Sequence, residues 1–293
     1  MSTEGVQPHL KNSLTILYDS IRWEEKALYE TAKKKGLEVE NVDCKNLTLN
    51  LNDKTAAYKD KIILQRCVSY FKNVHSTAAL EGLGALVINP LQAAIMCGNK
   101  LYSHMLLERA GVRTPKAFSA FSEEGALAAL DKHGYPAVIK PTVGSWGRLI
   151  ALLKDKEAAR AVIEDREHMF PIYQIYYFEE LVERPPRDIR AIVVGDRVVA
   201  AIYRYSGEGE WKTNMALGGH AEACPVTAEL EDICLKAARS LGGQIVGVDL
   251  MEGKEGLIVH EVNNTTEFKN TVRVTGVDIP GIMVDHALAQ SRG

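Results

Sequence analysis

Two short apolar segments near the carboxyl end of the chain carry acidic residues, and this combination constrains the fold more than any other feature. Residues 246–250 read V-G-V-D-L and residues 260–263 read H-E-V-N, with the glycine-containing turn 252–256 between them. Such segments predict two buried strands joined in a hairpin. Because a buried carboxylate without a partner is costly, Asp249 in the first strand favours a functional site over a hairpin with surface acids.

The predicted hairpin brings oxygen-bearing side chains together. Asp249 and Glu261 can lie side by side on the paired strands. Glu261 and Asn263 are two residues apart, so they point to the same face of their strand. Two carboxylates and a carboxamide form an all-oxygen ligand set, which suits Mg²⁺ that holds nucleotide phosphates. We therefore predict a metal site at Asp249, Glu261 and Asn263.

The composition is that of an ordinary globular enzyme or binding protein. The 293 residues are 46% hydrophobic and 25% charged, and the net charge of −3 favours neither nucleic acid nor an acidic membrane as a partner. No apolar run approaches the ~18 residues of a membrane span, and the first dozen residues lack a signal-peptide core. The 5 cysteines are widely spaced without a C-x-x-C pair, which indicates neither a zinc site nor disulfides. We predict a cytoplasmic protein.

The first third of the chain alternates predicted strands and helices. Residues 1–12 are polar and predict a loose tail. The alternation over residues 13–90 predicts a small parallel-sheet domain of the α/β class, although no glycine-rich phosphate fingerprint follows its first strand. The predicted strands are at 14–18, 39–42, 62–64 and 85–88, and the predicted helices are at 24–35 and 75–83.

Two further lobes complete the predicted organisation. The dipeptide Asn89-Pro90 marks the first boundary, and one helix over residues 91–110 opens a central lobe at residues 91–182. The third lobe, at residues 183–293, contains two predicted strands, the acidic hairpin and flanking helices. The sequence therefore predicts three lobes rather than a single sheet.

Several basic residues lie where phosphate-binding groups are expected. Lys140 ends an apolar strand just before the glycine-rich turn 143–148, whose backbone N–H groups could cradle phosphate oxygens. Arg148 could add a fork-shaped donor, and Lys100 opens a helix whose amino end attracts anions. Each of them also has a simple alternative role as a charge on the surface of a hairpin or helix.

Two arginines have two interpretations each. Asp188 and Arg190 lie on one face of a predicted strand, and a cross-strand ion pair is the simplest explanation. Arg190 and Arg204 could instead point toward the metal site and stabilise negative charge on a reacting phosphoryl group. Both interpretations stay open at the level of sequence.

Two other stretches are candidates for contact with a nucleotide or substrate. Residues 179–183, E-E-L-V-E, precede two prolines and fit either a solvated strand end or an interdomain hinge that binds adenine and ribose. Asn214 and Gly218 lie in a polar, glycine-rich stretch without strand character, which suits a loop on the substrate side.

Taken together, these motifs resemble the ATP-grasp superfamily, in the subgroup that includes the ribosomal-protein glutamate ligase RimK. The matching motifs are G-N-K at 98–100, Y-P-A-V-I-K-P at 135–141, D-I-R at 188–190, V-D-L at 248–250 and E-V-N at 261–263. The resemblance implies an ATP-grasp fold behind an N-terminal pre-ATP-grasp domain. The residues that it implies for ATP binding are Lys100, Lys140, Gly144, Ser145, Trp146, Gly147, Arg148, Glu180, Leu181, Val182 and Glu183.

The resemblance also implies a reaction, the ATP-dependent formation of an amide through an acyl phosphate. In such a ligase Asp249, Glu261 and Asn263 hold two Mg²⁺ ions against ATP. No nucleophilic side chain is required, which fits a chain without a Ser/His/Asp or Cys/His set. The residues implied in catalysis are Arg190, Arg204 and Lys140.

A finer resemblance, to the LysX ligases, concerns the substrates. Its motifs are I-L-Y-D-S-I-R-W-E-E at 16–25, Q-R-C-V-S at 65–69, G-S-W-G-R-L at 144–149 and N-N-T-T-E-F-K-N-T at 263–271. It implies that α-aminoadipate is joined to the small acidic carrier protein LysW in lysine biosynthesis, by an enzyme that forms dimers or tetramers. The alternatives are glutamate, as in the ArgX ligases of arginine biosynthesis, use of both amino acids, and RimK-like addition to a protein tail. The implied substrate contacts are Arg190, Asn214, Gly218, Thr265, Lys269 and Asn270.

Overall fold

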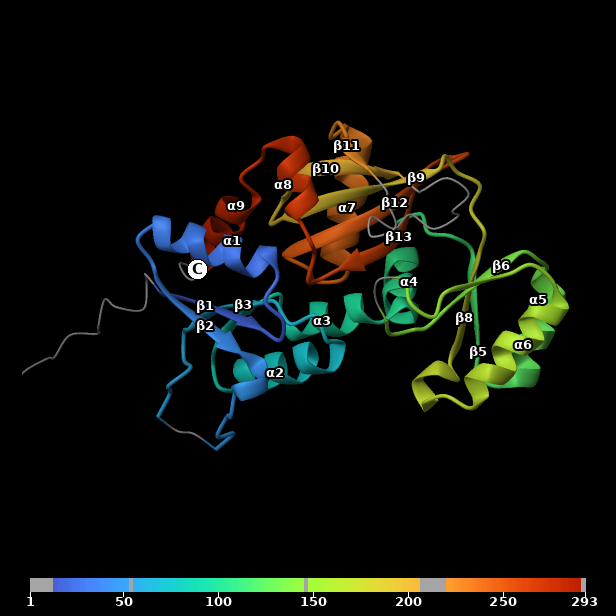
Figure 1. Ribbon diagram of the computed structural model, residues 1–293, viewed down its shortest axis with the longest axis horizontal. Coiled ribbons are helices and arrows are strands. Elements are labelled where there is room, and N and C mark those ends of the chain that lie inside the picture. Colours follow the sequence, from blue (N-terminus) through green and yellow to red (C-terminus); the bar gives the residue numbers. More distant parts are fainter. Residues whose placement is uncertain (1–12, 53–54, 145–146, 206–219, 291–293) are drawn as a thin grey trace, which may run out of the picture.

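The computed structural model describes residues 13–52, 55–144, 147–205 and 220–290. Three sheets with their helices form three lobes (Figure 1). The first sheet is parallel and the other two are antiparallel, so the predicted α/β class is confirmed. Within the described ranges, every helix is too short or too polar to cross a membrane.

The N-terminal lobe is a four-stranded parallel sheet in the order β2-β1-β3-β4. Its elements are β1 (Ser13–Tyr18), α1 (Trp23–Lys34), β2 (Glu38–Asp43), η2 (Cys44–Asn46), β3 (Ile62–Gln65), α2 (Tyr70–Gly82) and β4 (Leu86–Ile88). Helix α2 begins before the predicted residue 75, because the Ser69 hydroxyl accepts a hydrogen bond from Lys72 N–H and caps it. Because β2 and β3 lie on opposite sides of β1, a crevice forms at the carboxyl ends of β1 and β3.

The central lobe is an antiparallel sheet in the order β5-β8-β6-β7, with α5 and α6 packed together against it (Figure 1). Its elements are β5 (Ala117–Ala120), α5 (Glu123–His133), β6 (Ala137–Lys140), β7 (Ala151–Leu153), α6 (Lys156–Glu167), η3 (Pro171–Tyr173) and β8 (Tyr176–Glu180). Ile139 and Phe178 pair across β6 and β8 and pack into the core beneath these helices. Their strand neighbours Lys140 and Glu179 therefore point to the opposite face.

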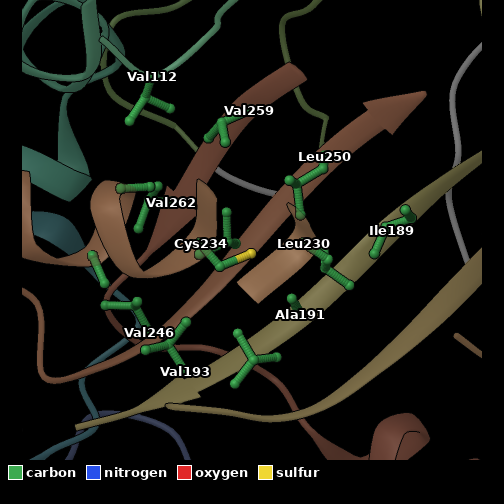
Figure 2. Packing of buried hydrophobic residues seen from close by; sticks show 14 of the residues in the cluster. Val112, Ile189, Ala191, Val193, Leu230, Cys234, Val246, Leu250, Val259 and Val262 are labelled. Carbon is green, nitrogen blue, oxygen red and sulfur yellow. The ribbon is translucent and has the colours of Figure 1, made fainter. Parts of the chain in front are cut away.

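The C-terminal lobe is a five-stranded antiparallel sheet in the order β11-β10-β9-β12-β13. Its elements are β9 (Arg187–Val194), β10 (Arg197–Tyr205), β11 (Ala221–Ala223), α7 (Ala228–Ser240), β12 (Ile245–Gly253), β13 (Gly256–Asn263), α8 (Lys269–Thr275) and α9 (Ile279–Gln290). Figure 2 shows the core between this sheet and α7, where Leu230 and Cys234 of the helix face Ile189, Val246 and Leu250 of the strands. The predicted hairpin is thus part of a larger sheet, in which β12 is buried as predicted and β13, at the sheet edge, is only partly buried.

The other face of this sheet shares a core with the N-terminal lobe. Ile192 and Ile245 of the C-terminal sheet belong to the same buried cluster as Leu14 and Leu28 of the N-terminal lobe and Met283 of α9. Helix α9 also packs against α1. Apolar burial therefore joins the first and last parts of the chain.

The helix predicted over residues 91–110 is interrupted, which corrects that prediction, whereas the prediction that Lys100 opens a helix is confirmed. The structure has α3 (Leu91–Gly98) and α4 (Lys100–Arg109), with Asn99 extended between them at φ −123°. The Asn99 side chain accepts hydrogen bonds at 3.0 and 3.3 Å from two N–H groups of the first turn of α4. This capping starts a new helix, so Lys100 lies at a helix amino end.

Candidate functional site

A large cleft lies where the three lobes meet, with a volume of about 1990 Å³. Every predicted site residue that the structure describes lines it. These residues are Lys100, Lys140, Gly144, Gly147, Arg148, Glu180, Leu181, Val182, Glu183, Arg190, Arg204, Asp249, Glu261, Asn263, Thr265, Lys269 and Asn270. The predicted residues Ser145, Trp146, Asn214 and Gly218 lie outside the described residues.

The acidic hairpin brings its three oxygen-bearing side chains together. Strands β12 and β13 pair with Asp249 opposite Glu261 and Gly247 opposite Asn263. The Asn263 amide donates a hydrogen bond to Asp249 Oδ2 at 3.4 Å. Strand periodicity predicted that Glu261 and Asn263 share a face, whereas the pairing of Asp249 with Glu261 depends on a register shift between Asp249 and Leu250, since Leu250 pairs with Val259.

Two arginines converge on Asp249, which is 3% exposed. Arg190 lies opposite Asp249 in the pairing of β9 with β12 and donates to it through both Nε and Nη2, the latter at 2.7 Å. Arg204 Nη2 lies 3.2 Å from Asp249 Oδ2, and the same guanidinium donates two hydrogen bonds to Asp188, at 2.6 and 2.9 Å. Both arginines form cross-strand ion pairs, which is the simpler of the two interpretations, and both also face the hairpin. Their contact with a phosphoryl group stays a prediction.

The two guanidinium groups determine the charge of Asp249. Burial by itself would raise the pKa of this carboxyl, but Arg190 and Arg204 hold it well below its usual range. Burial would likewise lower the pKa of Arg204, whereas Asp249 and Asp188 raise it. Asp249 is therefore a carboxylate and Arg204 is a cation at neutral pH.

Lys100 links the hairpin to the glycine-rich turn. Its Nζ lies 3.1 Å from Glu261 Oε1 and donates to Gly144 O at 2.8 Å. Its backbone N–H donates to Thr142 O at 2.7 Å, which fixes the start of α4 against the same turn. Burial would raise the pKa of Glu261, but Lys100 lowers it, so this residue is also a carboxylate.

Lys140 belongs to a buried polar cluster that the sequence analysis did not assign. Its Nζ donates to Glu179 Oε2 at 2.5 Å, and the Tyr177 hydroxyl donates to Glu179 Oε1 at 3.0 Å. His260 Nδ1 lies 3.5 Å from the same Nζ, and burial and Lys140 lower the pKa of this ring, so it stays neutral. Tyr177 and Glu179 are two residues apart, so the sequence could have shown that they share a face of one strand. Only the strand order places them beside Lys140.

Replacing Lys140 with methionine is expected to lower the free energy of unfolding by about 1–3 kcal/mol, because Glu179 would lose a charged partner while Tyr177 still donates to it. Lys156→Met is the matched control, because its ion pair with Asp131 is about half exposed, with side chains 49% and 45% accessible. The control is expected to change stability by less than about 1 kcal/mol. Urea denaturation of both variants measures the difference, and equal effects would contradict the prediction.

The hinge between the central and C-terminal lobes lines the cleft at residues 180–183. Strand β8 ends at Glu180, whose backbone N–H donates to Lys116 O at 2.9 Å and whose carboxylate accepts from Lys116 N–H at 3.0 Å. Glu183 is 80% exposed and pairs with Lys254 of the hairpin turn at 2.6 Å. The stretch therefore connects two lobes along one edge of the cleft.

Residues 264–270 follow the hairpin and lie between the C-terminal and N-terminal lobes. Lys269 and Asn270 line the cleft beside Arg22 and Glu24 of the N-terminal lobe. Glu24 accepts hydrogen bonds from the backbone of this segment, so the N-terminal lobe also forms part of the site. The sequence analysis quoted the motif that contains Arg22 and Glu24 but gave it no role.

The donor set at the hairpin fits Mg²⁺. No three His, Cys, Asp or Glu side chains within the described ranges are grouped as a metal site would need. Mg²⁺, however, is commonly held by one or two carboxylates together with phosphate oxygens and water. Asp249 and Glu261 supply the two carboxylates, and Asn263 adds a neutral oxygen donor. Arg190, Arg204 and Lys100 balance these charges in the structure.

Comparison with known proteins identifies the relatives of this chain. The RimK-like ATP-grasp domain matches residues 97–287, and the LysX preATP-grasp domain matches residues 14–96. The chain is 38% identical over 275 residues to the alpha-aminoadipate–LysW ligase LysX of Sulfurisphaera tokodaii, covering 92% of this chain and 96% of that protein. It is 30% identical to the glutamate–LysW ligase ArgX of Sulfolobus acidocaldarius, covering 93% and 97% of the two chains.

A solved structure has the same fold. The RimK domain ATP-grasp protein of Sphaerobacter thermophilus aligns with a TM-score of 0.76 over 94% of this chain and 99% of that one, at 23% identity. The two domain matches together extend over residues 14–287, with the pre-ATP-grasp domain before the ATP-grasp domain. The chain therefore belongs to the RimK-like ATP-grasp family, carries a LysX-type pre-ATP-grasp domain, and is an ATP-grasp carboxylate–amine ligase.

Proposed function

We propose that the protein joins the α-amino group of α-aminoadipate to the C-terminal glutamate side chain of a LysW-type carrier protein, with consumption of ATP, in lysine biosynthesis. The observation that carries this proposal is the cleft in which Lys100, Lys140 and two arginines surround the acidic hairpin. The choice of amino acid is supported by 38% identity to a LysX ligase, against 30% to an ArgX ligase.

ATP is assigned to the side of the cleft between the central and C-terminal lobes. ATP-grasp ligases use ATP and Mg²⁺. The phosphates would lie near Lys100 and Lys140, and the adenine and ribose would lie against the hinge at 180–183, which lines the same cleft. Support comes from the contact of Lys100 with Gly144 O, which places an ammonium group at the glycine-rich turn.

Asp249, Glu261 and Asn263 are the residues that would hold Mg²⁺, with two ions in this proposal. When bound, Mg²⁺ supplies positive charge that orients the phosphate oxygens and neutralises their charge. The chain itself supplies further cations, because Arg190 and Arg204 are held in place by Asp249 and Asp188. Cations that are already fixed stabilise negative charge without reorganisation during the reaction.

The reaction proceeds in two steps on these residues. The carrier carboxylate attacks the γ-phosphorus of ATP, and the bond from this phosphorus to the β-γ bridging oxygen breaks. ADP departs as the leaving group, and the carrier acyl phosphate is formed. Lys140, Arg190 and Arg204 face the developing negative charge. The neutral α-amine of the amino acid then attacks the acyl carbon, the carbon–oxygen bond to phosphate breaks, and phosphate and one proton are released as the amide forms.

A second candidate function is the ligation of glutamate, which the 30% identity to an ArgX ligase favours. Glutamate and α-aminoadipate differ by one methylene group, which is worth about 1–3 kcal/mol in recognition. We assign the choice to the residues after Asn263, of which Lys269 and Asn270 line the cleft. An enzyme that uses both amino acids is therefore one outcome of the test.

Ligation of a purified LysW-type carrier with ATP, Mg²⁺ and either amino acid tests the function. We expect one addition of α-aminoadipate per carrier and a preference in kcat/KM of about tenfold or more over glutamate, with intact-mass spectrometry as the readout. Equal efficiency would show dual use. Successive additions to one carrier would indicate RimK-like chemistry, and no addition of either amino acid would contradict the proposal.

A further inference from the structure

Two N-terminal motifs, R-W-E-E at 22–25 and Q-R-C-V-S at 65–69, take no part in the mechanism above, although both contribute to the cleft. They follow β1 and β3, so they form the crevice at the carboxyl ends of these strands. Asp19 ties the two loops together, because its carboxylate accepts hydrogen bonds from the N–H groups of Val68 at 2.8 Å and Ser69 at 3.1 Å. Such a crevice commonly binds a ligand, whereas here it holds residues 264–270 of the same chain.

Glu24 binds the backbone of this segment. It is 4% exposed, and its Oε1 accepts hydrogen bonds from Phe268 N–H at 3.1 Å and Lys269 N–H at 3.0 Å. The Phe268 ring is fully buried and packs edge-on against Trp23, with ring centroids 5.9 Å apart. The start of α1 therefore fixes the backbone from which the Lys269 side chain projects.

Arg66 binds the same segment two residues earlier. Its side chain is 2% exposed, its Nη2 donates to Thr266 O at 3.0 Å, and its Nε donates to Glu25 Oε1 at 3.0 Å. Its guanidinium also lies over the Phe268 ring, 5.7 Å from the centroid. A buried ion pair adds little net stability compared with apolar residues, so its placement on a backbone carbonyl is better explained by a positional role.

Asn73 and Gly247 also contact residues 264–270. Asn73 Nδ2 donates to Thr265 Oγ1 at 3.1 Å, and this hydroxyl donates to Cys67 O at 3.2 Å. The Thr265 hydroxyl is thus engaged within the protein, which favours an anchoring role over a substrate contact. A Cβ on Gly247 would lie 2.1 Å from Thr266 Oγ1, so the segment also lies directly against β12.

We propose that Glu24, Arg66 and Asn73 are positioning residues for the amino-acid site, which gives the N-terminal lobe a part in the choice of substrate. This inference rests on the proposed ligase function. The hydrogen bonds of Glu24 and Arg66 to residues 264–270 go to backbone groups, whereas Lys269 and Asn270 line the cleft. A displacement of about 1 Å at a substrate-positioning group can cost on the order of 100-fold in rate.

Glu24→Ala is the main test, compared with Glu24→Gln, which keeps a carbonyl oxygen, and with Glu30→Ala, an exposed residue of the same helix. Glu24→Ala is expected to raise the KM for α-aminoadipate about tenfold and to reduce the preference over glutamate, because a charged hydrogen-bond acceptor is lost. Glu24→Gln should recover most of the affinity, and Glu30→Ala should match the wild type. Formation of the carrier acyl phosphate needs no amino acid and should be unchanged, as measured by trapping with hydroxylamine and intact-mass spectrometry.

An unchanged KM in Glu24→Ala would overturn the inference, as would an equal loss of hydroxylamine trapping, which is the result of a general structural defect. If Glu24→Ala does not unfold cooperatively, Asn73→Ala decides the question, because it removes the hydrogen bond to Thr265. This variant should likewise raise the KM for α-aminoadipate and leave hydroxylamine trapping unchanged. Wild-type protein that traps no carrier hydroxamate would refute the ligase function instead. Failure of the positioning role and failure of the ligase function are therefore distinguishable.

Discussion

Glu261→Gln is expected to lower kcat for ligation about 100- to 1000-fold while the fold is retained. Glu261 lies opposite Asp249 and 3.1 Å from Lys100 Nζ, so the substitution removes one of the two charges that would hold Mg²⁺. Its side chain is 25% exposed, so a neutral amide there can still be hydrated. The rate of carrier modification, measured by intact mass over a Mg²⁺ titration, should show a higher Mg²⁺ requirement as well as a lower kcat.

Glu255→Gln provides the control for this prediction, because Glu255 is an exposed acid in the turn of the same hairpin. It should have the wild-type rate and the wild-type Mg²⁺ requirement. A Glu261→Gln enzyme that matches this control at low Mg²⁺ would show that the hairpin does not hold the metal, even if ligation itself is confirmed.

Asp249→Asn is expected to lower the free energy of unfolding by about 3–5 kcal/mol at neutral pH. Asp249 is 3% exposed and is the carboxylate between Arg190 and Arg204. Arg204 keeps its two hydrogen bonds to Asp188 in the variant, but Arg190 loses its carboxylate partner, and burying an uncompensated charge is costly. Chemical denaturation of both proteins measures the loss.

The control for this variant is Glu252→Gln, at the ion pair of Glu252 with Arg187, where both side chains are 27% exposed. Solvent screens this pair, so the expected loss is less than about 1 kcal/mol. Losses of the same size in the two variants would contradict the special role of the buried carboxylate.

The stabilising effect of Asp249 should depend on pH in a defined direction. Because the pKa of its carboxyl is lowered in the folded protein, the unfolded chain takes up the proton first as pH falls. The contribution is therefore fully present above the ordinary Asp pKa of about 3.9 and is lost as pH falls further, through the folded pKa. The unfolding free energies of wild type and Asp249→Asn should differ most at neutral pH and approach each other below about pH 3.

The acidic hairpin could be predicted from the sequence because its determinants are local. Apolar, β-branched segments flank a short glycine-containing turn, which predicts the hairpin but not the irregularity that sets its final register. Asp249 does pair opposite Glu261. The break of the helix at Asn99 was predicted only in part, since the sequence predicted one helix over residues 91–110 but also a helix start at Lys100. The Asn99 cap decides for the second.

The partners of the basic residues could be predicted only in part. Arg190 and Arg204 had two open interpretations, because the choice depends on which strands are neighbours. Local sequence does not predict the order of strands in a sheet. Lys140 meets Glu179 and His260 for the same reason, since three separate strands must come together. Motif resemblance placed these basic residues near ATP, but not in contact with particular acids.

The sequence by itself predicted most of the strands and helices, the acidic hairpin and, through the order of its motifs, the family. All of these depend on residues close together in the chain or on their order along it. Only the tertiary structure decided that Glu24 and Arg66 hold residues 264–270, at sequence separations of 244 and 200 residues. The physical reason is the apolar core that Leu14 and Leu28 share with Ile245, because its burial brings the first and last parts of the chain together.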